Sequence, residues 1–114
     1  MYNRVSIVNK LNRIRKRANK KGLNFDLTVD WYIKELERGT CAITGIPFNL
    51  EPYKGRMLPF IPTVDREDNS KGYTQDNCNL VVYIFNIAKG ENTYKEMYEW
   101  SKEYLRRNYE IMLG

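Results

Sequence analysis

The residue types best suited to chemistry are concentrated in one stretch, TVDREDNSKGYTQDN, at residues 63–77. It holds four acidic, two basic and three amide side chains, and almost nothing apolar follows Val64. The sequence has no histidine, so the usual general base near neutral pH is missing. Chemistry here would depend on carboxylate and carboxamide oxygens, which suit hard divalent cations such as Mg²⁺.

The flanking sequence predicts a β-hairpin that leads directly into a helix. PFIPTVD predicts an extended segment up to Asp65, which Pro62 restricts to an edge or irregular strand. NCNLVVY predicts the returning strand, and YIFNIAKG predicts a short helix closed by Gly90. Asp65, Asn77 and Asn86 can therefore converge on one point, although their spacing alone is a weak signal for a metal site.

Helices are predicted on both sides of this hairpin. In Asn3–Lys20, apolar residues recur at the spacing of one helical face, and Gly22 ends the pattern. Thr28 is placed to cap a second helix, VDWYIKELERG. Thr93 with Glu96 matches a capping box before a long C-terminal helix. The apolar face of that helix, which we expect to be core, consists of Tyr94, Met97, Tyr98, Leu105, Tyr109 and Met112.

Positive charge is concentrated at the N-terminal end. Residues 1–22 carry eight basic and no acidic residues, a net charge of +8, whereas the rest of the chain has 11 basic and 14 acidic residues, a net charge of −3. Lys10, Arg13, Arg17 and Lys20 form a stripe beside the apolar face of the first predicted helix. This asymmetry favours a polyanionic partner, and the alternative is a solvated face of a structural helix.

Composition limits the class of protein. A chain of 114 residues is long enough for one domain with one modest core. No apolar run approaches the roughly 20 residues that a membrane helix requires, and the N-terminus lacks a signal-like segment. Two cysteines, 37 positions apart, form neither a disulfide framework nor a four-ligand zinc set. We therefore expect a protein of a reducing, cytoplasmic setting that does not associate with membranes.

The stretch from Cys41 to Lys89 resembles the HNH (His-Me finger, ββα-metal) endonuclease family. CAITG stands where the family has C-x-x-C-G, VDRED where it has D-H, and NCNLVVYIFNIAK keeps two Asn and a Lys at the family's spacing. RANKKGLNFDLTVDW resembles the lead-in of phage-borne members, so the resemblance covers residues 13–90. It implies a ββα core at 41–90. Together with the basic helix predicted at 1–22 and the helix predicted at 92–113, this gives an α+β fold in a single domain, 1–114.

The resemblance also implies roles for the polar residues. Asp65 would hold a divalent cation, Mg²⁺ or Mn²⁺, and Asn86 would complete the metal ligands. Asn77 would fix the loop by hydrogen bonds to its backbone, while Lys71 and Lys89 would face phosphates. The alternative is that the stretch is a solvated turn in which Asp and Asn side chains cap their own backbone. The presence of Asn86 and Lys89 downstream favours the metal site over the solvated turn.

The sequence departs from the family at the zinc ligands. Many members bind a structural zinc through four cysteines, of which only Cys41 remains here. Thr44, Val82 and Phe85 occupy the other three positions. We therefore expect no structural zinc, with apolar packing of Val82 and Phe85 in its place and with Cys41 and Cys78 as small buried hydrophobes.

Arg66 stands where the family has its general-base histidine. A guanidinium stays protonated, so Arg66 could clamp a phosphate or stabilise transition-state charge but could not act as the base. Three alternatives remain open. In the first, Glu67 or Asp68 activates the attacking water, and in the second the protein is a slow metal-dependent enzyme that lacks a base. In the third, catalysis is lost and the scaffold binds DNA or a protein.

The sequence thus predicts an HNH-type, metal-dependent endonuclease acting on DNA, with Asp65, Arg66, Asn77 and Asn86 at its centre and Arg13, Arg17 and Lys20 on the DNA backbone. One alternative is a catalytically inactive HNH scaffold that acts as a DNA-binding regulator or as an inhibitor of another protein. Another is a structural or assembly protein that does not act on nucleic acid. The sequence does not determine whether the protein is a monomer or a homodimer. The phage-type resemblance implies expression in a bacterial host cell.

Overall fold

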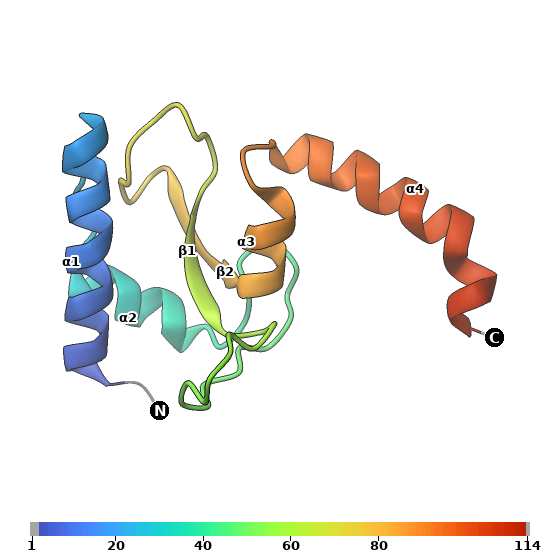
Figure 1. Cartoon of the computed structure of the whole chain (residues 1–114), viewed down its shortest axis with the longest axis horizontal. Coiled ribbons are helices and arrows are strands. Elements are labelled where there is room, and N and C mark those ends of the chain that lie inside the picture. Colours follow the sequence, from blue (N-terminus) through green and yellow to red (C-terminus); the bar gives the residue numbers. More distant parts are fainter. Residues whose placement is uncertain (1–2, 114) are drawn as a thin grey trace.

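The computed structural model describes residues 3–113, with side chains as far as residue 111. Two helices precede a two-stranded antiparallel sheet, and two helices follow it (Figure 1). In chain order the elements are α1 (Arg4–Lys21), α2 (Val29–Glu37), β1 (Pro62–Arg66), β2 (Cys78–Val82), α3 (Tyr83–Lys89) and α4 (Tyr94–Leu113). No helix in the described part of the chain is both long and apolar enough to cross a membrane.

Local sequence explains where α1 begins and ends. The side chain of Asn3 accepts hydrogen bonds from the backbone N–H groups of Val5 and Ser6, which satisfies two donors at the first turn. Gly22 ends the helix in the left-handed conformation, with φ of 68°. The predicted apolar face is confirmed, because its four residues are all buried: Ile7, Leu11, Ile14 and Ala18.

The hairpin is formed by β1 and β2, in a register that pairs Asp65 with Asn79 and Arg66 with Cys78. The eleven-residue loop between the strands, 67–77, is held against the segment that precedes α2. The Tyr73 backbone N–H donates to the Asn24 carbonyl at 2.9 Å, and the Tyr73 carbonyl accepts from Asp26 N–H at 3.1 Å. The loop is therefore fixed to the protein at its middle as well as at its ends.

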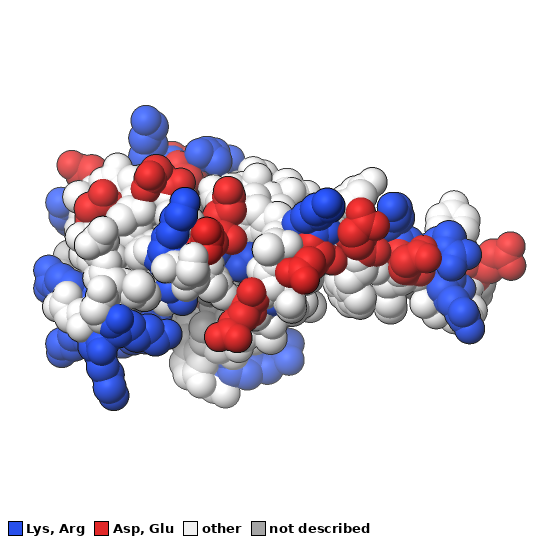
Figure 2. All heavy atoms as spheres, turned by 90° about the horizontal axis from the view of Figure 1, so that it is seen from above, with Lys and Arg blue, Asp and Glu red and all other residues white. Residues whose placement is uncertain are grey.

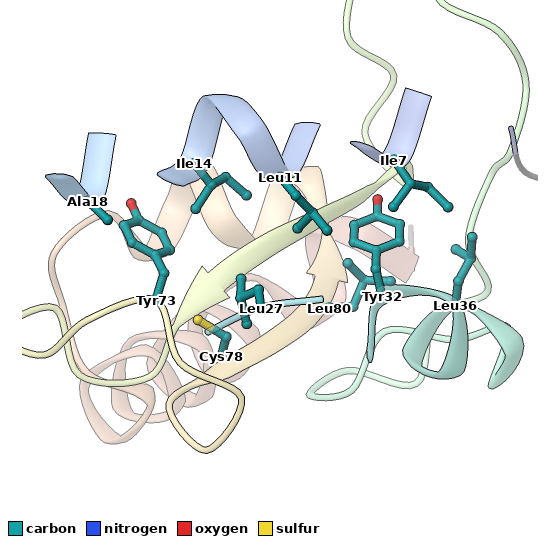
Figure 3. Packing of buried hydrophobic residues seen from close by; sticks show 10 residues of the cluster. All are labelled: Ile7, Leu11, Ile14, Ala18, Leu27, Tyr32, Leu36, Tyr73, Cys78 and Leu80. Carbon is teal, nitrogen blue, oxygen red and sulfur yellow. The ribbon is translucent and has the colours of Figure 1, made fainter. Parts of the chain in front are cut away.

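The main core lies between α1, α2 and the hairpin. Figure 3 shows side chains of α1 facing Tyr32, Leu27 and Tyr73. A second, smaller cluster consists of Cys41, Val81 and Val82 with Phe85 packed against it. The residues expected to replace the zinc site therefore pack together around Cys41.

The start of α4 follows the prediction, whereas its packing does not. The capping box is confirmed, since Glu96 N–H donates to Thr93 Oγ1 and Thr93 N–H donates to Glu96 Oε1. Met97 is buried, but Tyr98 and Leu105 are more than half exposed. The prediction that this apolar face is core was wrong beyond the first turn, because α4 extends away from the other elements (Figure 1). Tyr109 is also exposed, and the Met112 side chain lies outside the described residues.

Candidate active site

The interface between β1 and α3 brings the central polar residues together. Thr63 and Asp65 are two apart on a strand, so their side chains share one face. Asn86 and Lys89 are three apart on α3 and likewise share a face. Asn86 Nδ2 donates to Thr63 Oγ1 at 3.2 Å, and Lys89 Nζ donates to Asp65 Oδ1 at 3.3 Å. Asp65 and Asn86 therefore lie on the same strand–helix interface, not on opposite sides of the fold.

Asp65 is almost fully buried, and both carboxylate oxygens have partners. Oδ1 pairs with Lys89, and Oδ2 accepts a hydrogen bond of 2.9 Å from the Tyr94 hydroxyl. The Tyr94 oxygen in turn accepts from Asn79 Nδ2. Burial raises the pKa of Asp65 above its ordinary value, although the Tyr94 hydrogen bond and the Lys89 charge act in the opposite direction. The carboxylate is thus held in one orientation by two different elements.

Lys89 was expected to face phosphates, but it points into the protein. Its side chain is fully buried, and Nζ donates to the Arg66 carbonyl at 2.8 Å as well as to Asp65 and to Asn69 Oδ1. A buried ammonium must be paired and hydrogen-bonded, and these acceptors from β1 and the loop satisfy it. The prediction is therefore corrected, and Lys89 joins α3 to the end of β1.

Asn77 organises the polar loop through its own amide group. Its Oδ1 accepts from the Asp68 backbone N–H at 3.1 Å, while Nδ2 donates to the carbonyls of Asp68 and Gly72 at 3.0 and 2.9 Å. Asn77 is buried, so these bonds replace solvent for both backbone and side chain. They hold the two halves of the loop together.

The Arg66 guanidinium is directed into the same loop. Its NH1 group donates to the carbonyls of Asn69 and Lys71 at 2.9 and 3.0 Å, and its Cζ lies 4.5 Å from the centre of the Tyr73 ring. Both contacts stabilise the loop from within. In this arrangement Arg66 supports the loop backbone, and any contact with a phosphate would use its remaining N–H groups.

The remaining charged loop residues lie at the surface. Glu67, Asp68 and Lys71 are exposed. Asp68 accepts hydrogen bonds from the backbone N–H and the hydroxyl of Ser70, which hold the pKa of its carboxyl below the ordinary value. These hydrogen bonds use Asp68 Oδ1, whereas no described residue donates to the Glu67 carboxylate, so Glu67 is the freer of the two to accept a proton from water.

The basic stripe of α1 is not part of this group. Arg13, Arg17 and Lys20 are exposed on α1, and Figure 1 shows α1 and α3 on opposite sides of the hairpin. In Figure 2 basic side chains gather at the edge of the molecule formed by α1, whereas acidic and basic side chains alternate along α4. The structure therefore separates a basic surface from the buried polar centre.

The donors at the β1–α3 interface fit a divalent cation in type. Residues 3–113 contain no group of three or more Cys, Asp or Glu side chains arranged to bind a metal. Mg²⁺, however, commonly uses one or two protein carboxylates and takes its other ligands from water and phosphate. A carboxylate has more lone pairs than the two that Asp65 uses, and no described residue donates to Asn86 Oδ1. The positive charge of Lys89 beside Asp65 opposes a second cation there.

Sequence reasoning did not identify Tyr94 as a site residue. Tyr94 is the first residue of α4, where the apolar pattern suggested core packing, yet its hydroxyl reaches Asp65. Asn79 and Thr63 were likewise missed, although both hydrogen-bond to site residues. Asn79 offered one signal, since the register pairs it with Asp65 across the hairpin.

The hairpin, its long polar loop and the helix that follows have an HNH-like α+β fold. The structure is similar to a solved structure of the rare-cutting HNH restriction endonuclease PacI, with a TM-score of 0.58 and 22% sequence identity over 80% of this chain and 70% of that chain. This similarity confirms the HNH-like α+β fold that the family resemblance implied. No protein-family model matches the chain, and no curated protein matches it.

Proposed function

We propose that this protein is an HNH-type endonuclease that hydrolyses phosphodiester bonds in DNA with the help of Mg²⁺ or Mn²⁺. The observation that carries the proposal is the meeting of Asp65 on β1 and Asn86 on α3 at one interface. It is supported by the similarity of the fold to PacI, an HNH restriction endonuclease described as perturbing DNA.

Asp65 and Asn86 would hold the metal ion, which when bound polarises a phosphate and lowers the pKa of its water. The chain's own residues position these two ligands. Tyr94 and Lys89 fix the Asp65 carboxylate, and the Nδ2 group of Asn86 is anchored on β1, which leaves Oδ1 as the donor to the ion. Preorganised ligands of this kind cost little to align when substrate arrives.

Proton transfer requires a group other than Arg66. Glu67 follows it directly at the end of β1 and is exposed, so its carboxylate is accessible to water beside a bound phosphate. A carboxylate is a weaker base than the histidine of the HNH family near neutral pH, so we expect slow turnover. The basic face of α1 would add contacts to the DNA backbone that do not depend on sequence.

One observation favours a second function, a catalytically inactive HNH scaffold that binds DNA. The buried ion pair between Lys89 and Asp65 already neutralises the carboxylate that would hold the metal. If this pair persists when DNA binds, Asp65 has a structural role and no cation enters. The basic face of α1 would then carry the function without hydrolysis.

The test measures DNA nicking and metal binding separately. Supercoiled plasmid is incubated with the protein in Mg²⁺, Mn²⁺ or EDTA, and ¹⁵N NMR spectra are recorded as Mn²⁺ is added. We expect nicking only with metal, together with paramagnetic broadening of the Asn86 side-chain amide signal. Asp65→Asn should abolish both effects.

The matched control is Asp76→Asn, which removes an exposed carboxylate from the same loop. It should leave nicking and broadening unchanged. Selective broadening at Asn86 without nicking would leave the metal site standing and locate the defect in proton transfer or in the choice of DNA. No broadening at Asn86, with DNA binding retained, would replace the nuclease by the inactive scaffold.

A further inference from the structure

A cavity of about 610 Å³ lies between α1, α2 and the segment 49–62. It is separate from the candidate active site, because none of the residues placed at the β1–α3 interface or in the polar loop lines it. Pro62, the first residue of β1, is the one residue of that strand that lines the cavity. Its volume falls within the range of roughly 300–1,000 Å³ typical of small-molecule sites.

One residue of the cavity lining has a buried hydroxyl that lacks a partner. Tyr32 lines it and is 1% exposed, and its Oη is the one buried side-chain polar atom among the described residues without a hydrogen bond. Figure 3 shows this hydroxyl directed towards α1, beside the core side chains of that helix. Because buried polar groups are nearly always hydrogen-bonded, a hydroxyl without a partner on a residue that lines the cavity points to a missing partner.

Three cationic side chains also line the cavity: Lys10, Arg13 and Arg56. None of them forms an ion pair or donates a hydrogen bond within residues 3–113, and the lining has a single carboxylate, Glu51. Lys10 is partly buried, with Nζ 5.8 Å from the centre of the Tyr32 ring, and burial followed by the charge of Arg13 lowers its pKa. Such uncompensated positive charge in a recess favours an anion.

Most of the remaining lining is apolar, including Leu50, Met57 and Ile61, and the uncharged polar residues are Asn3, Ser6 and Asn49. Tyr53, which is 68% exposed, stands at the same cavity and offers an aromatic face. The cavity thus combines a cationic part with an apolar and aromatic part. Aromatic faces beside positive charge are the features with which proteins bind the bases and phosphates of single-stranded nucleic acids.

We propose that this cavity binds one nucleoside phosphate, with the phosphate at Lys10, Arg13 and Arg56, the base against the apolar wall, and the Tyr32 hydroxyl as a hydrogen-bonding partner of the ligand. The same chemistry is presented by a free mononucleotide and by the terminal nucleotide of a single DNA strand. The inference goes beyond the proposed nuclease and does not depend on a metal ion at Asp65.

The test is calorimetric titration of the whole protein with dTMP, with inorganic phosphate and with a 5′-phosphorylated thymidine tetranucleotide. We expect dTMP to bind at least tenfold more tightly than phosphate, because the apolar wall contacts only the nucleoside. Tighter binding of the tetranucleotide than of dTMP would identify a DNA strand as the source. Equal binding of these two would identify a free mononucleotide, and either result supports the site.

Two variants test the residues. Tyr32→Phe should weaken dTMP binding at least tenfold while thermal unfolding is unchanged or occurs at higher temperature, because an unpaired buried hydroxyl is removed. Arg56→Gln should weaken binding similarly, whereas Lys54→Gln, the same loss of charge at a neighbouring residue outside the lining, should stay within twofold.

The proposal is overturned if wild-type protein binds no nucleotide, if phosphate binds as tightly as dTMP, or if Tyr32→Phe binds dTMP as wild type does. The test of this nucleotide site is independent of the test of the proposed nuclease. Asp65→Asn, titrated below its own unfolding temperature, should bind dTMP normally whether or not the plasmid is nicked, since Asp65 does not line the cavity.

Discussion

At the scale of single residues, the buried ion pair between Asp65 and Lys89 holds β1 and α3 together. Asp65 and Lys89 are 4% and 0% exposed, and removing either one leaves an unpaired charge inside the protein. Lys89→Met should therefore lower the free energy of unfolding by about 3–5 kcal/mol at pH 7. The loss should shrink towards pH 4, because the pKa of the unpaired Asp65 rises further and the folded state takes up a proton that the unfolded state lacks.

The double variant Asp65→Leu with Lys89→Met is the control. Replacing both charges by apolar side chains removes the desolvation penalty, so most of the lost stability should return. Urea unfolding of the wild type, both single variants and the double variant measures the coupling. Additive losses in the double variant would mean that the two groups do not form a buried pair.

Cys78 gives the protein a pH dependence on the alkaline side. Burial raises the pKa of its thiol to about 12, whereas an unfolded cysteine titrates near about 8.5. The unfolded state therefore loses its proton first, and stability that is complete below this value is lost as the pH rises. We expect the free energy of unfolding to fall by up to about 1.4 kcal/mol per pH unit above pH 9.

Urea unfolding between pH 8 and pH 10 checks this expectation, and Cys78→Ala should make the profile flatter. Tyr32, whose pKa burial raises to about 12, contributes only above about pH 10, where an unfolded tyrosine begins to titrate. A wild-type profile with the same slope as that of Cys78→Ala would show that the thiol is not buried in solution.

The sequence predicted where these residues lie better than it predicted what they contact. Asp65 and Asn86 were placed on adjacent elements correctly, because strand and helix periodicity fix side-chain direction. Lys89 was expected to face phosphates because the family resemblance implied it, whereas its acceptors on β1 and the loop make its burial possible. Tyr94 was missed because its contact with Asp65 depends on the angle at which α4 leaves α3.

At the scale of elements, the loop 67–77 is packed against the backbone of residues 24–26. Gly72 packs so closely on the Asn24 backbone that a Cβ atom there would collide with the Asn24 nitrogen and carbonyl. Gly72→Ala should therefore displace the loop and cost about 1–3 kcal/mol of stability. Hydrogen exchange should be faster at Asp68 N–H, which is hydrogen-bonded to Asn77.

Lys71→Ala is the matched control for this prediction, because Lys71 adjoins Gly72 and is exposed. Its effect should stay within about 0.5 kcal/mol. If Gly72→Ala proved equally mild, the loop would not be packed on residues 24–26 in solution.

The helix ends that depend on capping residues were predicted correctly. The caps at Thr28 and Thr93 and the stop at Gly22 are where residue types indicated, since capping is a matter of a few neighbouring residues. The pairing of Phe25 with Tyr73 joins residues far apart in the sequence, and nothing local announces it. The exposure of α4 was also unpredictable, because amphipathic spacing shows that a face exists without showing what covers it.

At the scale of the whole molecule, charge is distributed unequally between the two ends. The basic stripe of α1 has no acidic neighbours within residues 1–22, whereas α4 carries four basic and four acidic residues, several of them paired along the helix. If the protein binds DNA as proposed, we therefore expect the α1 end to release most of the counterions. Since α1 and α3 lie on opposite sides of the hairpin, DNA that uses both must reach around the sheet (Figure 1).

Salt dependence of DNA binding tests this division. The slope of log affinity against log salt falls by about 0.9 for each DNA phosphate that the protein no longer neutralises, so the triple variant Arg13→Gln, Arg17→Gln, Lys20→Gln should lower it by about 2–3. The matched triple variant on α4, Lys95→Gln, Lys102→Gln, Arg106→Gln, removes the same charge and should change the slope by less than about 1. Fluorescence anisotropy with labelled duplex from about 50 to about 200 mM salt measures both. Equal slopes for the two variants would mean that net charge alone drives binding, and a larger change for the α4 variant would move the DNA-binding surface to the other end of the molecule.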